Sequence, residues 1–158
     1  MAQVQLKLQR YKSWLVGSHL LHLEQILAWV RIRRRRPPHV LREAVVDTGA
    51  PMTVFPQKEW HLFEREINWL TELDDANVPT WCKQFSGVAG GIIPCRLGAL
   101  SIEFFDHIGG RIGPAEVVAM FAHDGGKMRD ILIGLGGGPF KKRRFEMIHD
   151  QSAISFSP

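Results

Sequence analysis

The residues best suited to chemistry lie in a short segment, Asp47-Thr48-Gly49, which interrupts an apolar run. Residues 44–46 are apolar at consecutive positions, so we expect Asp47 to emerge from a strand that is covered on both faces. A carboxylate is costly to bury there without a partner. Gly49 permits a tight turn with space beside the carboxylate, and the Thr48 hydroxyl can lock the loop by hydrogen bonding. Asp47 is therefore either an ordinary turn residue or one half of a carboxylate pair that performs acid–base chemistry.

The elements that would hold Asp47 in place are mostly strands. Residues 40–47 predict a strand that ends at Asp47, and residues 52–55 predict another just after the turn. Residues 57–73 have helical periodicity, and we expect their aromatic side chains to cover the sheet rather than to shape a substrate channel. Further strands, some paired in hairpins, are predicted at 81–98, 100–105, 115–122, 129–135, 145–150 and 153–157. Short strands with glycine-rich turns predict an all-β fold, either a closed β-barrel or a sandwich.

The segment AVVDTGAPMTVF (44–55) resembles the active-site motif of the retropepsin-like aspartic proteases, the single-lobe family of retroviral type. Alanine directly after Asp-Thr-Gly is typical of that family. FSGVAGGIIPCRLG (85–98) resembles the flap, the glycine-rich hairpin that closes over a bound peptide in these enzymes. DILIGLGGG (130–138), with Leu132, Ile133 and Gly134, resembles the apolar segment that packs beneath the catalytic loop. The three segments occur in the family's order, and the resemblance covers about residues 40–148.

The resemblance implies an aspartic endopeptidase of the retropepsin-type all-β barrel, in which water is activated by two carboxylates that share one proton. The chain of 158 residues carries one Asp-Thr-Gly motif and is too short for two lobes, so the second carboxylate is expected from Asp47 of another copy in a homodimer. The resemblance makes Asp47, Thr48 and Gly49 catalytic, with Thr48 bonding across the two-fold axis. It assigns contacts with a peptide or protein substrate to Ala50, Gly87, Val88, Gly90, Gly91 and Ile92.

Two features depart from the family pattern. Gly136 stands where retropepsins usually carry Asp or Asn before a helix, and glycine and proline in GLGGGPF are poor helix formers. A helix could still begin at Pro139 and continue through FKKRRFEM (140–147). The gap between Asp47 and the flap is also long, because it contains residues 57–73. The Gly136 region and the long N-terminal extension leave open an alternative, a dimerisation or peptide-binding module on the retropepsin fold with weak or no catalysis.

The sequence predicts neither a metal site nor a cofactor. Its two cysteines, Cys82 and Cys95, form no Cys-x-x-Cys pair, and the seven histidines lack the spacing that would complete four zinc ligands. The low cysteine count also argues against a disulfide scaffold. A reducing, cytoplasmic compartment fits this composition, although one disulfide remains compatible with it.

The N-terminal residues 1–38 look like an extension that precedes a domain at 39–158. Within them, residues 13–30 place Leu20, Leu23 and Ile26 at helical spacing and predict an amphipathic helix. We expect this helix to dock on the protein rather than to anchor it in a membrane, since each charge at a bilayer centre costs about 2.5–3.5 kcal/mol. The extension could be a regulatory segment, a docking helix or a propeptide.

The net charge of +4 is concentrated in two basic runs, RIRRRR (31–36) and KKRR (141–144). Such runs are usually solvated, so contact with nucleic acid is not expected. Binding of nucleic acid through the two runs nevertheless stands as a third hypothesis, and it predicts a steep dependence on salt.

Overall fold

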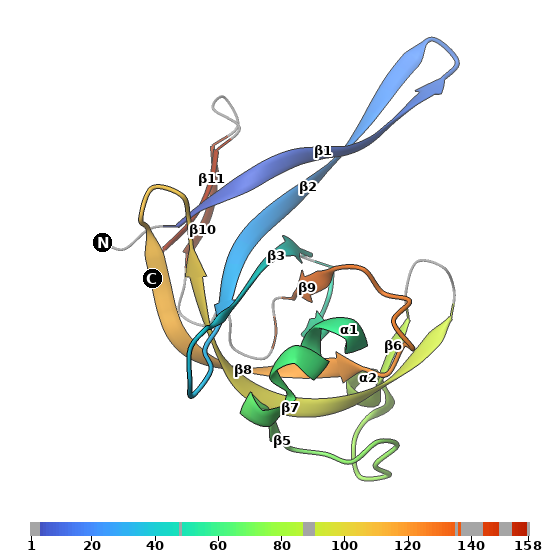
Figure 1. The fold of residues 1–158 in the computed structure, drawn as a ribbon. Coiled ribbons are helices and arrows are strands. Elements are labelled where there is room, and N and C mark those ends of the chain that lie inside the picture. Colours follow the sequence, from blue (N-terminus) through green and yellow to red (C-terminus); the bar gives the residue numbers. More distant parts are fainter. Residues whose placement is uncertain are drawn as a thin grey trace.

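The computed structural model of the protein describes residues 4–47, 49–86, 91–134, 136, 144–148 and 153–157, and most of them lie in strands (Figure 1). The strands are β1 (Val4–Val16), β2 (His19–Ile32), β3 (Val40–Val46), β4 (Thr53–Phe55), β5 (Asn68–Trp69), β6 (Gln84–Ser86), β7 (Ile92–Phe105), β8 (Arg111–Ala122), β9 (Ile131–Ile133), β10 (Arg144–Ile148) and β11 (Ala153–Ser157). The helices are short: α1 (Gln57–Trp60), the 3-10 helix η1 (His61–Glu66) and α2 (Thr80–Lys83). The prediction of an all-β fold is confirmed.

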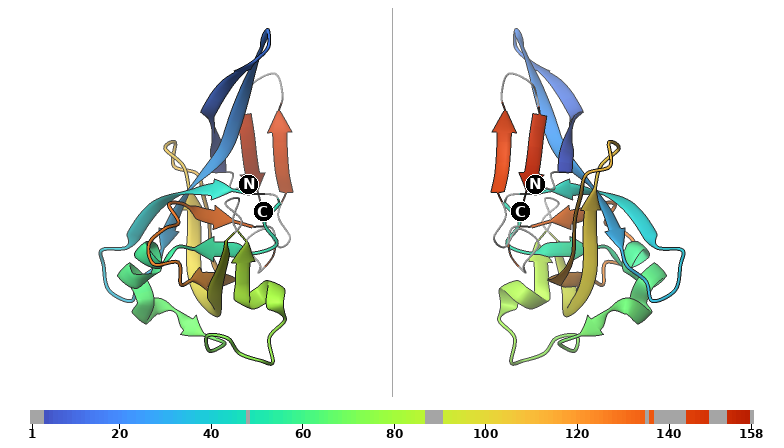
Figure 2. Two further views of the ribbon diagram at one scale, coloured as in Figure 1. Left: turned by 90° about the vertical axis from the view of Figure 1, so that its right-hand side faces the viewer. Right: turned by 90° about the vertical axis from the view of Figure 1, so that its left-hand side faces the viewer.

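The strands form one mixed sheet in the order β10-β11-β1-β2-β3-β9-β4-β8-β7-β5, with β6 added beside β7. Two pairings, β3 with β9 and β4 with β8, are parallel, and the other described pairings are antiparallel. The sheet curls so far that β2 also pairs with β7, from Trp29↔Phe105 to Ile32↔Ile102. Figures 1 and 2 show the strands wrapping around the core while the β1–β2 hairpin projects away from it.

The strand predictions on both sides of Asp47 are confirmed, because β3 ends at Val46 and β4 begins at Thr53. The predicted glycine-centred hairpin is also present, since β6 pairs antiparallel with β7 from Ser86↔Ile92 to Gln84↔Pro94. Strands β8, β9, β10 and β11 match the remaining predicted segments. The alternative helix over 140–147 is wrong from residue 144 onwards, because that part forms β10, and residues 139–143 lie outside the described residues.

The helix predicted over 57–73 is wrong in its length. Only α1 and η1 are helical, and the chain then becomes extended at Ile67 and pairs with β7 as β5. The predicted role of the aromatic side chains is confirmed: Trp60 and Phe63 are buried in the main core cluster. Phe63 meets the ring of Phe55 edge-on at 5.5 Å, and Phe55 stacks on Phe121 at 5.4 Å. The segment thus covers one side of the curled sheet.

The predicted N-terminal helix is wrong, because residues 13–30 belong to the β1–β2 hairpin. Gly17 adopts a φ of +61° in a two-residue turn, and strand pairing starts at once with Val16↔His19. Along the second half of β2 the buried residues alternate, Ala28, Val30 and Ile32, which is the period of a strand with one face on the core. Since β2 pairs with β3 and β7, the sheet continues across the domain boundary predicted near residue 38.

The first basic run divides between the sheet and a loop. Arg31 lies on β2 and pairs with the carboxylate of Glu103, a residue that is only 5% exposed. Arg33 and Arg35 follow in the loop between β2 and β3, where their side chains are exposed, as a solvated run predicts. Of the second run, only Arg144 lies in a described strand. Within the described ranges, no helix has the length and apolar character needed to span a membrane.

Candidate active site

Asp47 is positioned by the end of a strand that lies between two others. Strand β3 pairs with β2 on one side and runs parallel to β9 on the other, with Val46 opposite Ile133. The Asp47 N–H donates to the Ile133 carbonyl oxygen at 3.0 Å, so the backbone stays fixed for one residue beyond the strand. The consecutive apolar residues before Asp47 reflect this central place in the sheet, as the sequence predicts.

The loop after Asp47 turns back around its carboxylate. The Gly49 N–H donates to Asp47 Oδ1 at 2.9 Å, and the Ala50 N–H donates to the Asp47 carbonyl oxygen at 3.2 Å. A Cβ on Gly49 would lie 3.3 Å from Asp47 Oδ1, a tight contact, so glycine at this position leaves space beside the carboxylate. Thr48, the residue predicted to lock the loop, lies outside the described residues.

The segment after β9 lies directly against this loop, which confirms the predicted packing of the Leu132–Gly134 segment. A Cβ on Gly134 would come within 2.4 Å of the Met52 backbone, and one on Gly136 within 2.0 Å of the Pro51 carbonyl oxygen. The Gly136 N–H donates to that same oxygen at 2.8 Å. Gly136, the departure from the family pattern, therefore ties the segment after β9 to the loop that carries Asp47.

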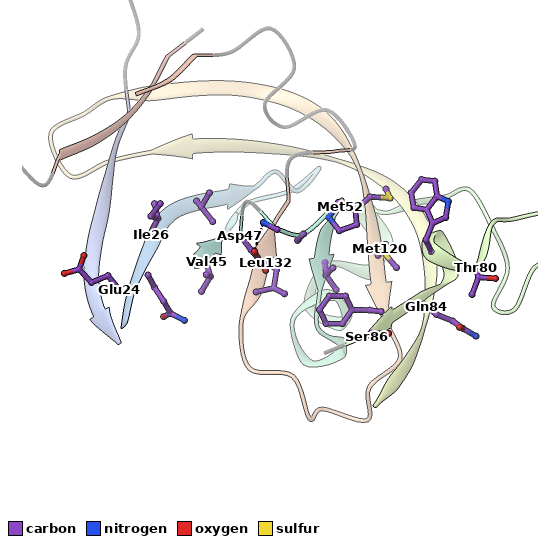
Figure 3. Close-up of a pocket in the computed structure, with 18 residues that line it drawn as sticks. Glu24, Ile26, Val45, Asp47, Met52, Thr80, Gln84, Ser86, Met120 and Leu132 are labelled. Atoms are coloured by element: carbon purple, nitrogen blue, oxygen red, sulfur yellow. Dashed lines mark hydrogen bonds between the residues drawn. The ribbon is translucent and has the colours of Figure 1, made fainter. Parts of the chain in front are cut away.

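Asp47 lies in a cleft of about 1020 Å³, shown in Figure 3. This volume is at the upper end of what small-ligand pockets usually have. The lining residues come from seven strands and helices and from the Asp47 loop: Glu24, Gln25, Ile26, Val45, Val46, Asp47, Gly49, Ala50, Pro51, Met52, Val54, Thr80, Trp81, Gln84, Phe85, Ser86, Met120 and Leu132. In Figure 3, Asp47 lies in the middle, with Glu24 and Ile26 of β2 on one side and Thr80 and Gln84 on the other.

The cleft lining combines apolar and polar side chains. The apolar ones include Met52, Val54, Met120 and Leu132. In Figure 3, Leu132 lies beside Asp47, and the polar residues Glu24 and Gln84 lie towards the ends of the cleft. Asp47 and Glu24 are the two carboxylates among the described lining residues. An aspartate within a large cleft that also offers apolar side chains can act as an acid or a base on a bound molecule.

The predicted site residues are only partly brought together. Asp47, Gly49 and Ala50 line the cleft. Gly91 and Ile92 lie at the start of β7, where Ile92 is 66% exposed, and neither lines the cleft. Gly87, Val88 and Gly90 fall outside the described residues. The hairpin reaches the cleft instead through Gln84, Phe85 and Ser86 of β6.

Sequence reasoning missed most of the cleft walls. Thr80 and Trp81 of α2 precede the flap-like segment, and no motif marks them. The sequence analysis predicts a helix at Glu24, Gln25 and Ile26. A helix there does not predict that β2 runs beside β3. The pairing Ile26↔Val46 brings these residues to Asp47. The two-residue Gly17-Ser18 turn between apolar segments is the signal that could have revealed this hairpin.

Asp106 and Asp124, two aspartates that are more deeply buried than Asp47, serve loops rather than the cleft. Burial opposes ionisation of Asp106, but N–H groups of Gln5, Gly110 and Ile108 donate to its carboxylate and hold its pKa below the ordinary value. The pKa of Asp124 is likewise lowered, against the effect of burial, by the N–H groups of Met128 and Gln57. Neither residue lines the cleft. Their geometry identifies them as anchors of the turns at 106–110 and 124–128.

The two cysteines are free and buried near the base of the hairpin. Burial raises the pKa of the Cys82 thiol, and burial together with the negative charge of Asp124 raises the pKa of Cys95 to about 12. Thiols with such raised pKa values are poor nucleophiles at neutral pH. In the described ranges, no three side chains of His, Cys, Asp or Glu gather in a way that could hold a metal ion.

Comparison with models of known protein families and with curated proteins finds no match to this chain.

Proposed function

We propose that the protein is a homodimeric aspartic endopeptidase with a β-barrel of the retropepsin type. The observation that carries the proposal is the position of Asp47: its carboxylate accepts a hydrogen bond from the Gly49 N–H inside a large cleft that is lined in part by apolar side chains. The supporting features are the parallel β3–β9 pair that fixes the loop and the β6–β7 hairpin beside the cleft. These features match the parts that the sequence resemblance assigns to a catalytic loop, its support and a flap.

The proposed chemistry needs two carboxylates. When two Asp47 side chains lie close together, one proton is shared between them because two negative charges at such a separation resist joint ionisation. The ionised Asp47 takes a proton from water as the water oxygen attacks the peptide carbonyl carbon, and the protonated Asp47 donates its proton to the carbonyl oxygen. The tetrahedral intermediate then collapses, a proton passes to the leaving nitrogen, and an acid and an amine are released.

The second carboxylate in this proposal belongs to a second copy of the chain. The sequence holds a single Asp-Thr-Gly motif, and the other carboxylate at the cleft, Glu24, lies at one end of it rather than beside Asp47 (Figure 3). A two-fold axis next to Asp47 supplies an identical carboxylate and doubles the cleft. Thr48, Gly49 and Ala50 would then surround the pair, while Gly87, Val88, Gly90, Gly91 and Ile92 would form the flap over the peptide.

The test compares wild type with Asp47→Asn, using a mixed peptide library between about pH 4 and 7, with and without pepstatin. The matched control is Asp130→Asn, which makes the same change at an exposed aspartate outside the cleft. We expect cleavage by wild type and by Asp130→Asn, inhibition by pepstatin, and loss of at least about a thousandfold in kcat for Asp47→Asn. Equal cleavage by wild type and Asp47→Asn would overturn the catalytic role of Asp47.

Two other outcomes would also contradict the proposal. No cleavage by wild type while a stable dimer binds peptides would assign the fold to a peptide-binding module instead. Sedimentation that shows only monomer at tens of micromolar, together with undetectable cleavage, would leave Asp47 without its partner.

A further inference from the structure

The outer part of the β1–β2 hairpin extends beyond the rest of the sheet. We refer to residues 12–23 as the arm. Its two strands pair with each other from Lys12↔Leu23 to Val16↔His19, whereas pairing of β2 with β3 begins only at Ile26 and pairing of β1 with β11 ends at Leu6. Among the described strands, the arm has no third strand beside it, and Figures 1 and 2 show it projecting from the body.

The end of the arm is unusually apolar for an exposed ribbon. Leu15 is 72% exposed, Val16 57%, Leu20 58% and Leu21 50%. These are four of the twelve large apolar side chains that are exposed in the described part of the chain, and they lie within seven residues. Isolated two-stranded ribbons are marginally stable in water, and a cluster of exposed apolar side chains usually marks a contact surface.

The arm begins at one end of the cleft that holds Asp47. Glu24, Gln25 and Ile26, at the base of the arm, line that end. The opposite end is lined by Thr80 and Trp81 of α2 and by β6, and the Trp81 side chain is 60% exposed. In Figure 3, Asp47 lies between the two ends. The cleft therefore has an apolar projection on one side and an exposed indole on the other.

A two-fold axis that passes beside Asp47 and crosses the length of the cleft would bring these two features together. Such a rotation would reverse the direction of the cleft, so the arm of one copy would come to the α2–β6 side of the other copy. At about 3.3 Å per residue, the five residues of β2 that precede Glu24, residues 19–23, extend roughly 17 Å from the cleft end. The contact forms twice by symmetry, so each copy both gives and receives an arm.

We propose that the arm is a dimerisation clasp, in which Leu15 and Leu20, which share one face of the ribbon at the tip, pack on the α2–β6 surface around Trp81 of a second copy. This inference rests on the proposed function, because the proposed function supplies the two-fold axis at Asp47. The clasp explains why apolar side chains are exposed at the arm tip and at Trp81. It also explains why the hairpin extends beyond the part that pairs with the rest of the sheet. The occupant of the Trp81 surface is thus another copy of this chain.

The first test measures dimerisation in the Asp47→Asn background, which removes self-cleavage. The arm variant Leu15→Ser/Leu20→Ser changes two residues that face each other across the ribbon. The control variant Leu62→Ser/Leu73→Ser makes the same change at leucines that are 50% and 41% exposed and lie on other segments. By sedimentation velocity over a concentration series, we expect the dimer Kd to rise at least about tenfold in the arm variant and to stay unchanged in the control.

An unchanged Kd in the arm variant would overturn the clasp. So would an equal rise in both variants, because general loss of solubility or stability would then explain it. The arm variant is also tested with vesicles of phosphatidylcholine and phosphatidylserine. Vesicle binding that depends on the arm leucines while the dimer Kd does not would identify the tip as a lipid contact and overturn the proposal.

The second test does not depend on how well the arm variant folds. Leu20→Cys chains and Trp81→Cys chains, carrying different affinity tags, are mixed, allowed to exchange and treated with a bis-maleimide. The native thiols are buried, so the introduced ones react first. We expect a crosslink between chains with different tags, and its absence in a mixture shown to exchange would overturn the clasp.

The two proposals fail in different ways. If the arm variant dissociates and the crosslink forms but wild type cleaves no peptide, the clasp stands and the protease proposal fails. If wild type cleaves peptides and the arm variant dimerises and cleaves as well as wild type, the protease proposal stands and the clasp fails.

Discussion

The Gly136 N–H donates to the Pro51 carbonyl oxygen at 2.8 Å, and a Cβ on residue 136 would lie 2.0 Å from the same atom. The contact joins the segment after β9 to the loop that carries Asp47. The retropepsin-like proteases, which the sequence resembles, usually have Asp or Asn at the position of Gly136. From the sequence, Gly136 therefore predicts a weakened site. The geometry gives a reason for glycine, since any side chain at this position would meet the backbone of the loop.

The first prediction concerns this contact. Gly136→Ala places a Cβ against a backbone oxygen, so either the segment or the Asp47 loop must move and their hydrogen bond must weaken. We expect a loss of about 3 kcal/mol in the free energy of unfolding, at the upper end of typical overpacking. Urea unfolding followed by tryptophan fluorescence measures it.

The control for this change is Gly91→Ala. A Cβ on Gly91 would meet none of the described residues within 4 Å, and this glycine does not have a positive φ. The free energy of unfolding should therefore change by less than about 0.5 kcal/mol. Similar losses in both variants would show that the Gly136 contact does not control stability.

The second prediction concerns the buried ion pair of Arg31 and Glu103. Arg31 Nε donates to Glu103 Oε2 at 2.8 Å, and Glu103 is only 5% exposed. Arg31→Ala leaves a buried carboxylate unpaired, which should reduce the free energy of unfolding by about 3–5 kcal/mol. Since Arg31 joins β2 to β7, the loss should appear as a lower urea midpoint for the whole sheet.

Two further variants test whether the loss comes from the burial of an unpaired charge. Glu72→Ala breaks the pair with Arg96, in which the Glu72 side chain is 85% exposed, and should cost less than about 1 kcal/mol. Arg31→Met/Glu103→Met removes both charges and should recover most of the loss, because no unpaired charge remains. Equal effects of Arg31→Ala and Glu72→Ala would argue against a burial cost.

The parts of the fold that the sequence predicts well are those with strong local signals. Consecutive apolar residues before Asp47 predict a central strand, and β3 lies between β2 and β9. The positions along the chain of the strands after Phe85 also follow from alternation and glycine turns. These signals depend on near neighbours in the sequence, so a single chain carries enough information for them.

The N-terminal hairpin shows why other parts were predicted wrongly. Apolar residues at 20, 26 and 27 fit a helical face, but Ala28, Val30 and Ile32 also fit one face of a strand. The choice is made by tertiary pairing, because β2 bonds to β3 on one side and to β7 further along. Gly17 at a positive φ fixes the turn, and the cleft wall at Glu24–Ile26 could be placed only after that pairing was known.

The last prediction concerns pH and His123, which is next to the buried Asp124. Burial, followed by the positive charges of Arg96 and His61, lowers the pKa of His123 below its ordinary value of 6.5. Its Nε2 is buried without a hydrogen-bond partner in the described structure. The unfolded chain therefore takes up a proton near pH 6.5 while the folded chain stays neutral. The contribution of His123 to stability is complete above about pH 7 and declines as pH falls towards its folded pKa.

His123→Phe removes this proton uptake and keeps a ring beside Trp60, whose centroid lies 5.2 Å from that of His123. We expect the free energy of unfolding of wild type to fall more steeply than that of the variant between pH 7 and 5, measured by urea titration at constant salt. Asp106 and Asp124 affect stability only at lower pH, because their pKa values are lowered. Their contribution to the free energy of unfolding is present above the ordinary carboxyl pKa of about 4 and is lost below it. Parallel pH profiles for wild type and His123→Phe would contradict the prediction, whereas a difference that appears only below about pH 7 would assign it to His123.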